Sequence, residues 1–216
     1  VTGRSGSGKS TLLHILGGLM KPVTGRVLLD ETDIYALGEA ERDALRRCHI
    51  GIAPQRLMSL AALTVRENIL LPALLTGQEE ASAARADVLM ERLGIRKLAS
   101  VTPSELSGGE QRRVTIARAL VMQPEILLAD EPTGDLDEEN TQSVLRLLRE
   151  TADAGTAVLL VTHEREAAAY ADAAYTMTAG KLDKIAFRQA DTPSRSNSPK
   201  FCALAIKRET FGNPVA

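Results

Sequence analysis

Aromatic residues are scarce in this chain of 216 residues: it has no tryptophan, and its three tyrosines and three phenylalanines amount to 3%. Charge of one sign is lacking as well, because 26 lysines and arginines stand against 28 aspartates and glutamates. Surfaces that bind nucleic acid usually carry a basic excess and aromatic side chains on which bases stack. The composition therefore argues against nucleic acid as a direct partner.

Cysteine and long apolar runs are also rare. Cys48 and Cys202 are far apart and form no metal-ligand spacing, so we expect a reducing compartment and no cysteine-bound metal. A span of the bilayer needs roughly 18 apolar residues. The richest stretch, 57–75, is interrupted by polar residues at 66–68. We expect no transmembrane segment, so any membrane role would come through a partner.

Apolar segments typical of strands alternate with segments of helical pattern. The strand-like segments are 26–30, 50–53, 126–129, 157–162 and 174–178. The helical segments are 9–20, 39–48, 64–93 with Pro72 and Gly77 as breakers, 110–122, 138–153 and 164–171. This order predicts an α/β fold with a mostly parallel sheet flanked by helices.

A phosphate-binding loop opens the chain. Residues 3–11 read GRSGSGKST and satisfy the pattern G-x-x-x-x-G-K-[ST]. The backbone N–H groups and the following helix favour phosphate, Lys9 is placed to pair with the β- and γ-phosphates, and Ser10 to ligate Mg²⁺. Alone, this loop does not separate ATPases from GTPases or small-molecule kinases. The nucleotide-binding residues expected here are Gly3, Arg4, Ser5, Gly6, Ser7, Gly8, Lys9, Ser10 and Thr11.

An acidic pair ends the apolar strand at 126–131, which reads ILLADE. At the carboxyl edge of a parallel sheet, Asp130 is placed beside the Mg²⁺ of a nucleotide. Glu131 follows directly and points elsewhere, where it can accept a proton from an attacking water.

A second anion-binding turn lies at 106–113, which reads LSGGEQRR and opens a helix. One chain thus has two phosphate-binding turns but only one lysine loop. We therefore expect two copies to face each other, each closing the nucleotide site of the other. The residues expected to act in this way are Ser107, Gly108, Gly109 and Glu110.

These motifs resemble the ATP-binding subunits of ABC transporters. The phosphate loop, LSGGE, ILLADEP, the segment TGDLD at 133–137, Gln55 and His163 follow in the order of that family as far as about Leu182. The segment LTVRENILLP at 63–72 resembles the branch that serves lipoprotein release, macrolide export and peptide-antibiotic resistance.

The resemblance implies a role for each motif. Glu131 would be the general base and His163 would hold the γ-phosphate and the water. Gln55 would join Ser10 and Asp130 as metal ligands. Ser107 and Gly109 would contact the ATP of the opposite copy, which Asp137 would help to position. The implied cofactors are ATP and Mg²⁺. The implied partners are a second copy and integral membrane permease subunits. The implied location of the chain is peripheral, at the cytoplasmic face of the inner membrane.

The resemblance also implies a domain organisation. An ATPase domain would span 1–190, with an inserted helical subdomain at roughly 56–122, and a polar, proline-containing segment at 191–216 would be a flexible tail. Family members have a strand and an adenine-stacking aromatic before the phosphate loop, whereas this chain opens at Val1 inside that motif. We therefore expect a truncated cassette.

For several other residues we expect a structural role and no part in catalysis. His14 and His49 have no motif around them and are taken as structural, and Arg112, Arg113 and Arg118 as a solvated and packing helix face. Asp135 stands where asparagine or alanine is more usual in the family. The alternative functions are a soluble ABC-type ATPase of DNA repair or translation, and an inactive truncated cassette.

Overall fold

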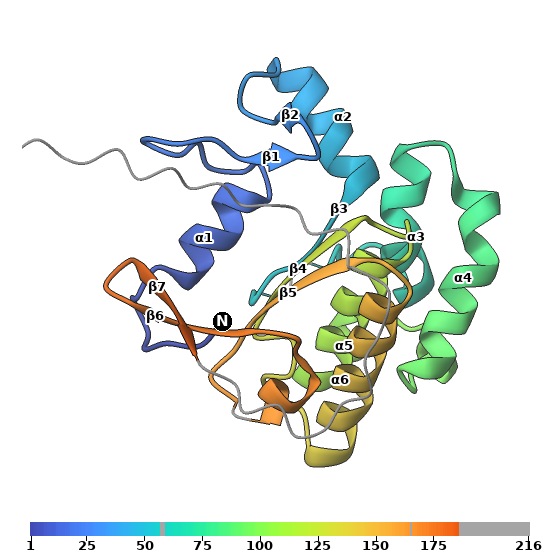
Figure 1. Ribbon diagram of the computed structural model, residues 1–216. Helices are drawn as coiled ribbons and strands as arrows, with labels where there is room; N and C mark the ends of the chain where they lie inside the picture. The colour runs from blue at the N-terminus through green and yellow to red at the C-terminus, as the bar shows by residue number, and fades with distance from the viewer. Residues whose placement is uncertain (57–58, 165, 186–216) are drawn as a thin grey trace, which may run out of the picture.

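A three-stranded parallel sheet lies at the centre of the chain, whose computed structural model describes residues 1–56, 59–164 and 166–185 (Figure 1). The strands follow the order β3 (Ile50–Ala53), β4 (Ile126–Asp130) and β5 (Ala157–Val161). The register pairs Ile50 with Ile126 and Ile126 with Ala157. All three strands therefore end at one edge, where residues 55, 130 and 163 follow or close them.

Both faces of this sheet are covered, as the apolar strands predict. Leu127 and Ala129 of β4 belong to the larger core with α5 (Gly108–Leu120) and α6 (Glu138–Asp153). Leu128 points the other way and packs with Leu13 of α1 (Lys9–Leu16). Figure 1 shows α1 on one side of the sheet and α5 and α6 on the other.

The first two residues bridge the sheet to a hairpin formed by β6 (Ala174–Thr178) and β7 (Lys181–Ile185). The backbone N–H of Thr162 donates to Val1 at 3.1 Å on one side. On the other side the N–H groups of Thr2 and Met177 donate to Tyr175 and Thr2 at 2.9 and 2.7 Å. These bonds fix the start of the phosphate loop against β5 and β6.

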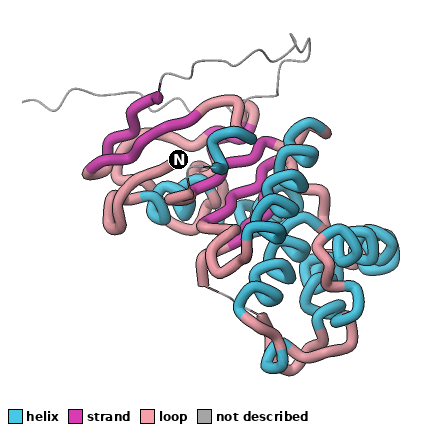
Figure 2. The backbone as a smooth tube through the Cα atoms, turned by 90° about the horizontal axis from the view of Figure 1, so that it is seen from below, coloured by secondary structure: helices cyan, strands magenta, loops and turns pink. Residues whose placement is uncertain are grey.

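A helical lobe is formed by α3 (Val65–Leu75), α4 (Glu79–Arg92) and α5, and Figure 2 shows most of the helices gathered on one side of the strands. Thr64 caps α3 through a capping box with Glu67. Buried Asn68 donates from its amide to the carbonyls of residues 60, 63 and 64, each at 3.0 Å. These bonds hold residues 60–64, which precede α3, against the first turns of that helix.

Several element boundaries differ from the sequence prediction. Pro72 lies inside α3 instead of ending it, because that helix buries residues such as Val65 and Ile69 completely, and this packing outweighs the cost of the proline. The segment at 26–30 contributes only β1 (Leu28–Leu29), which pairs with β2 (Thr32–Asp33).

Two further elements near the end of the described chain differ from the sequence prediction. The expected helix at 164–171 is a 3-10 helix over Glu166–Tyr170. The polar strand β7 is exposed throughout and was not predicted. The remaining elements are α2 (Glu39–His49) and the 3-10 helices Arg96–Leu98 and Pro103–Glu105. The expected tail at 191–216 lies outside the described residues.

Candidate functional site

The phosphate loop is closed by its own lysine. Lys9 Nζ donates to the carbonyl oxygens of Gly3 and Arg4 at 2.8 and 3.1 Å. Gly8 caps α1 with a φ of 105°, in the left-handed region that glycine enters without steric cost. A Cβ on Gly3 would lie 2.4 Å from the carbonyl oxygen of Met177. The shape of the loop therefore depends on its glycines.

An oxygen pair lies beside the loop. Ser10 Oγ donates to Asp130 Oδ2 at 2.7 Å, which joins the first turn of α1 to the last residue of β4. Gln55 lines the same cavity from just beyond β3. These are the hard oxygen donors that Mg²⁺ prefers when phosphate and water complete its coordination. Among the described residues there is no group of three or more His, Cys, Asp or Glu side chains that could hold a metal alone.

Glu131 and His163 form the second pair. His163 Nδ1 lies 3.0 Å from Glu131 Oε2, and the backbone N–H of His163 donates to the same oxygen at 3.3 Å. Glu131 has a φ of 49°, a conformation that costs energy for any residue with a side chain. Its own N–H is fixed by the carbonyl of Val161 at 2.8 Å. The carboxylate is thus buried and oriented, while the imidazole remains 73% exposed.

One cavity of about 460 Å³ brings these groups together. Every residue that lines it belongs to the set predicted from the sequence. Seven come from the phosphate loop and four from the predicted catalytic and metal residues: Gly3, Ser5, Gly6, Gly8, Lys9, Ser10, Thr11, Gln55, Asp130, Glu131 and His163. Of the same loop, Arg4 and Ser7 do not line the cavity; Arg4 is exposed and Ser7 is buried.

The LSGGE residues do not line this cavity. Ser107 caps α5: its Oγ accepts from the Glu110 N–H at 3.3 Å, and the Glu110 carboxylate accepts from the N–H and the hydroxyl of Ser107, each at 2.8 Å. These hydrogen bonds, that of the Ser107 N–H first, lower the pKa of Glu110. Ser107 and Gly108 are exposed, so this end of the helix is accessible.

Asp137 is likewise a helix cap outside the cavity. It accepts from the backbone N–H of Asn140 at 2.8 Å at the start of α6, and this bond lowers the pKa of Asp137. The carboxylate is exposed. Asp137 and the start of the LSGGE turn are therefore accessible from outside and lie apart from the lining of the cavity.

Sequence reasoning missed two contacts around the segment 133–137. Thr133 Oγ1 donates to Glu164 Oε2 at 2.6 Å, next to His163. Arg112, interpreted as part of a solvated and packing helix face, lies on the packing side: it is 5% exposed, its Nη2 lies 3.7 Å from Asp135 Oδ2, and its Nη1 donates to the carbonyl of Gln55 at 2.7 Å. The sequence of α5 does not show which of its three arginines is buried.

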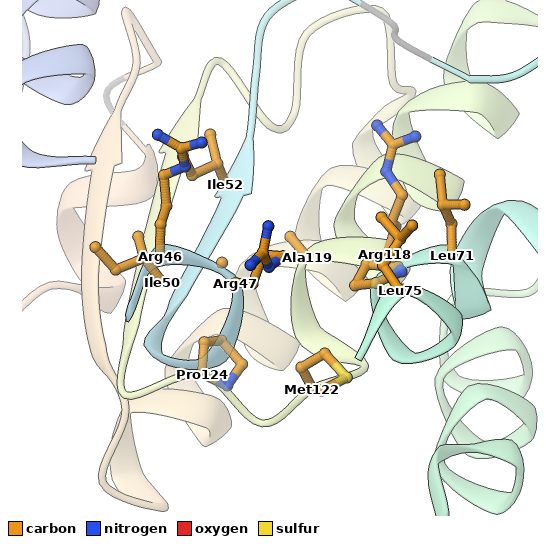
Figure 3. A pocket seen from close by; sticks show the side chains of 12 residues that line it. Arg46, Arg47, Ile50, Ile52, Leu71, Leu75, Arg118, Ala119, Met122 and Pro124 are labelled. Atoms are coloured by element: carbon orange, nitrogen blue, oxygen red, sulfur yellow. The ribbon is translucent and has the colours of Figure 1, made fainter. Parts of the chain in front are cut away.

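A hollow of about 290 Å³ is lined by residues of the sheet and of the helical lobe (Figure 3). Its wall is largely apolar, with three arginine side chains among the lining residues. The side chains labelled in Figure 3 are Arg46, Arg47, Ile50, Ile52, Leu71, Leu75, Arg118, Ala119, Met122 and Pro124. We call this the arginine groove. In the described part of the chain, no helix has the length and apolar character needed to cross a bilayer.

Comparison with known proteins agrees with the site. The family described as ABC transporter matches residues 1–134. The lipoprotein-releasing system ATP-binding protein LolD of Shewanella sp. (strain MR-7) is 45% identical over 188 residues, 86% of this chain and 81% of the relative. The macrolide export ATP-binding/permease protein MacB of Bartonella henselae is 43% identical over 183 residues, 84% of this chain but 28% of that relative.

Two solved structures of ATP-binding cassettes resemble this chain as well. The ATP-binding cassette MJ0796, in a dimeric post-hydrolysis state bound to ADP and Pi, matches with a TM-score of 0.77 and 33% identity over 85% of this chain and 83% of that one. A dimeric structure described as MJ0796, a bacterial ABC transporter cassette, also matches with a TM-score of 0.77, at 34% identity. With the family matching well over half of the residues and the cavity built from its motifs, the chain belongs to the ABC transporter family, as one of its ATP-hydrolysing cassettes.

Proposed function

We propose that this cassette hydrolyses Mg-ATP in a site completed by a second copy and thereby drives a membrane permease. The observation that carries the proposal is the cavity, whose lining combines the phosphate loop, an oxygen pair for a metal and a buried carboxylate. The accessible LSGGE turn and Asp137, both outside the cavity, support the contribution of a facing copy.

In this proposal the phosphate loop and Lys9 hold the phosphates. Lys9 exchanges its bonds to the loop carbonyls for the β- and γ-phosphates. Ser10, Asp130 and Gln55 would hold Mg²⁺, which would neutralise the charge of the phosphates when it is bound. Arg4, Ser5 and Thr11 complete the nucleotide contacts around the loop.

Glu131 is the proposed general base. Its burial and its fixed φ keep the carboxylate in one place, where it can accept the proton of an attacking water. While the carboxylate is ionised, the hydrogen bond to His163 keeps a proton on Nδ1 and orients the ring. His163 Nε2 then faces away from Glu131 and can contact the γ-phosphate. Across the pair, Ser107, Gly108 and Gly109 contact that phosphate from the other copy, and Glu110 holds their turn in shape.

The test is the oligomeric state of Glu131→Gln with and without Mg-ATP, measured by size exclusion with light scattering. Removal of the base should trap an ATP-bound dimer, and Ser107→Arg should abolish it. A protein that stays monomeric with bound ATP would show that the site is not shared.

The proposed partners are integral membrane permease subunits, which would place the cassette peripherally at the cytoplasmic face of the membrane. The arginine groove is the proposed docking position, because its apolar wall and its three arginines suit an apolar segment with an acidic side chain. Given the relatives in lipoprotein release and macrolide export, we propose export or extrusion of a lipoprotein, peptide or drug.

Docking is tested by co-expression with the permease and membrane sedimentation. Leu75, 68% exposed in the groove, is changed to Asp, and Leu182, 39% exposed on β7, is the control. We expect Leu75→Asp to leave the membrane fraction and Leu182→Asp to remain there. Equal sedimentation of the two variants would exclude the groove as the docking site.

A further inference from the structure

Arg112 is an unusual side chain in this structure, because it is a cation with an exposed fraction of only 5%. Its Nη1 donates to the backbone carbonyls of Gln55 and Pro54 at 2.7 and 3.3 Å. Its Nη2 lies 3.7 Å from Asp135 Oδ2. A buried guanidinium is stable only while such partners remain in place. The positions of these partners relative to α5 are therefore restrained by one side chain.

Three functional segments meet at this side chain. Arg112 itself lies in the second turn of α5, whose first turn is the LSGGE segment. Gln55 lines the nucleotide cavity, and Asp135 belongs to the segment 133–137 that ends at Asp137. The three segments are far apart in sequence, and the guanidinium touches two of them from the third.

The packing around Arg112 leaves little freedom. A Cβ on Gly109 would lie 3.2 Å from the carbonyl oxygen of Asp135, so the first turn of α5 already contacts the segment 133–137. Asp135 has a φ of 66°, a backbone conformation that costs energy for a residue with a side chain. The Nε of Arg112 is buried without a hydrogen-bond partner among the described residues. This group is held by its neighbours rather than free to swing out.

The contacts differ in strength. The bonds to the Gln55 and Pro54 carbonyls are partly buried and charge-assisted, whereas the Asp135 side chain is 74% exposed and its ion pair is screened by solvent. The contact of Arg112 with the backbone at Gln55 is therefore the stronger of the two. The contact with Asp135 is the weaker one, and a second molecule that binds at this surface can displace it.

We propose that Arg112 is a positioning residue that holds Gln55 in the nucleotide cavity and ties its position to the segment 133–137 facing the second copy. The inference rests on the proposed function. Closure of the pair presses on the segment 133–137 and on the LSGGE turn, and Arg112 transmits that contact to Gln55. Binding of nucleotide to one copy depends mainly on the phosphate loop and Lys9, which this link does not touch, whereas dimerisation and turnover also need Gln55 in position.

The experiment uses the full chain in the Glu131→Gln background and measures two quantities: affinity for a fluorescent ATP analogue, and the protein concentration at which Mg-ATP forms the dimer. For Arg112→Gln we expect an affinity within twofold of the parent and a dimerisation constant weaker by tenfold or more. Arg112→Lys keeps the charge and one donor, so it should recover part of the loss.

The matched control is Arg85→Gln. Arg85 is also partly buried, and its Nε donates to the carbonyl of Leu120 at 3.1 Å within the helical lobe. It should dimerise as the parent does. With Glu131 restored, kcat should fall at least tenfold for Arg112→Gln while KM for ATP changes less than twofold. A general loss of stability would not produce this separation.

The outcomes separate the two proposals. A Glu131→Gln parent that never dimerises with ATP would overturn the shared site and this inference together. A parent that dimerises while Arg112→Gln dimerises equally well would overturn the inference alone. If Arg112→Gln does not unfold cooperatively, Arg112→Lys takes its place, and a lysine variant with unchanged dimerisation and kcat contradicts the role of Arg112.

Discussion

At the scale of single residues, Glu110 belongs to a predicted phosphate-binding motif, but its observed contacts are those of a helix cap. The LSGGE motif places it beside a predicted phosphate contact, yet its carboxylate accepts hydrogen bonds from Ser107 and so completes the cap of α5. A negative charge there competes with an incoming phosphate for the same helix end. Its role is therefore to shape the turn that Ser107 and Gly109 present.

This cap makes stability depend on pH. The hydrogen bonds from Ser107 hold the pKa of Glu110 below its ordinary value of 4.5 in the folded state. A group with a depressed folded pKa contributes fully above the unfolded value and loses the contribution as pH falls through the folded value. We predict that Glu110→Gln lowers the free energy of unfolding by less than about 0.5 kcal/mol at pH 7, because solvent screens the interactions of this accessible carboxylate, and by less as the pH falls below about 4.5.

Urea denaturation of both proteins between pH 7 and pH 3 measures this difference. In the Ser107→Ala background one of the two donors to the carboxylate is gone, so the pH-dependent part should shrink. A difference that stays constant over the whole pH range would show that the carboxylate is not held by the cap.

At the scale of elements, the close approach of β3 and α5 fixes where the arginine groove lies. A Cβ on Gly51 would lie 2.3 Å from the carbonyl oxygen of Ala119 and 2.9 Å from Pro124 Cγ. Both contacts involve rigid groups, so an added methyl must push α5 away from the sheet. Gly51 and Ala119 also line the groove, which links this packing to the proposed docking surface.

We predict that Gly51→Ala lowers the free energy of unfolding by about 1–3 kcal/mol, as overpacking of a tight core does. The control is Gly108→Ala, where the nearest atom to the new methyl, Asp135 Cβ, is 4.0 Å away. That variant should stay within about 0.5 kcal/mol of the parent. Thermal and urea unfolding measure both. Equal stability of Gly51→Ala and the parent would mean that α5 is free to shift.

The elements also show what sequence can and cannot predict. The strand at 50–53, the helix at 138–153 and the strand at 174–178 were predicted with the observed bounds, because apolar periodicity and caps are local signals. Pro72 misled because its helix is stabilised by tertiary packing, and β7 was missed because an exposed strand has no alternating pattern. Arg112 could not be placed, since its partners are carbonyls 57 and 58 residues away.

The site was predictable for a different reason. Its loop, acidic strand end and histidine each carry chemistry in a short motif, and parallel strands bring their carboxyl ends to one edge. The contacts between motifs, such as Thr133 with Glu164, depend on how the loops pack and have no signature in the sequence.

At the scale of the whole molecule, the phosphate loop and the LSGGE turn of one chain serve different nucleotides if two copies pair symmetrically. A copy with Lys9→Ala keeps its LSGGE turn, and a copy with Ser107→Arg keeps its phosphate loop. Each variant alone has no intact site in its homodimer. A mixed dimer has one intact site, built from the Lys9 of one copy and the Ser107 of the other.

We therefore predict that each variant alone has ATPase activity near background and that an equal mixture regains activity. A mixed dimer has one intact site of two, so recovery should be ~25% of the parent activity if the copies pair at random, and at most ~50% if only mixed dimers form. The measurement is phosphate release against mixing ratio, with a maximum expected at equal amounts. The matched control is a single copy that carries both substitutions, titrated into either variant, which should add nothing. Activity in the separate variants, or none in any mixture, would contradict a site shared between two copies.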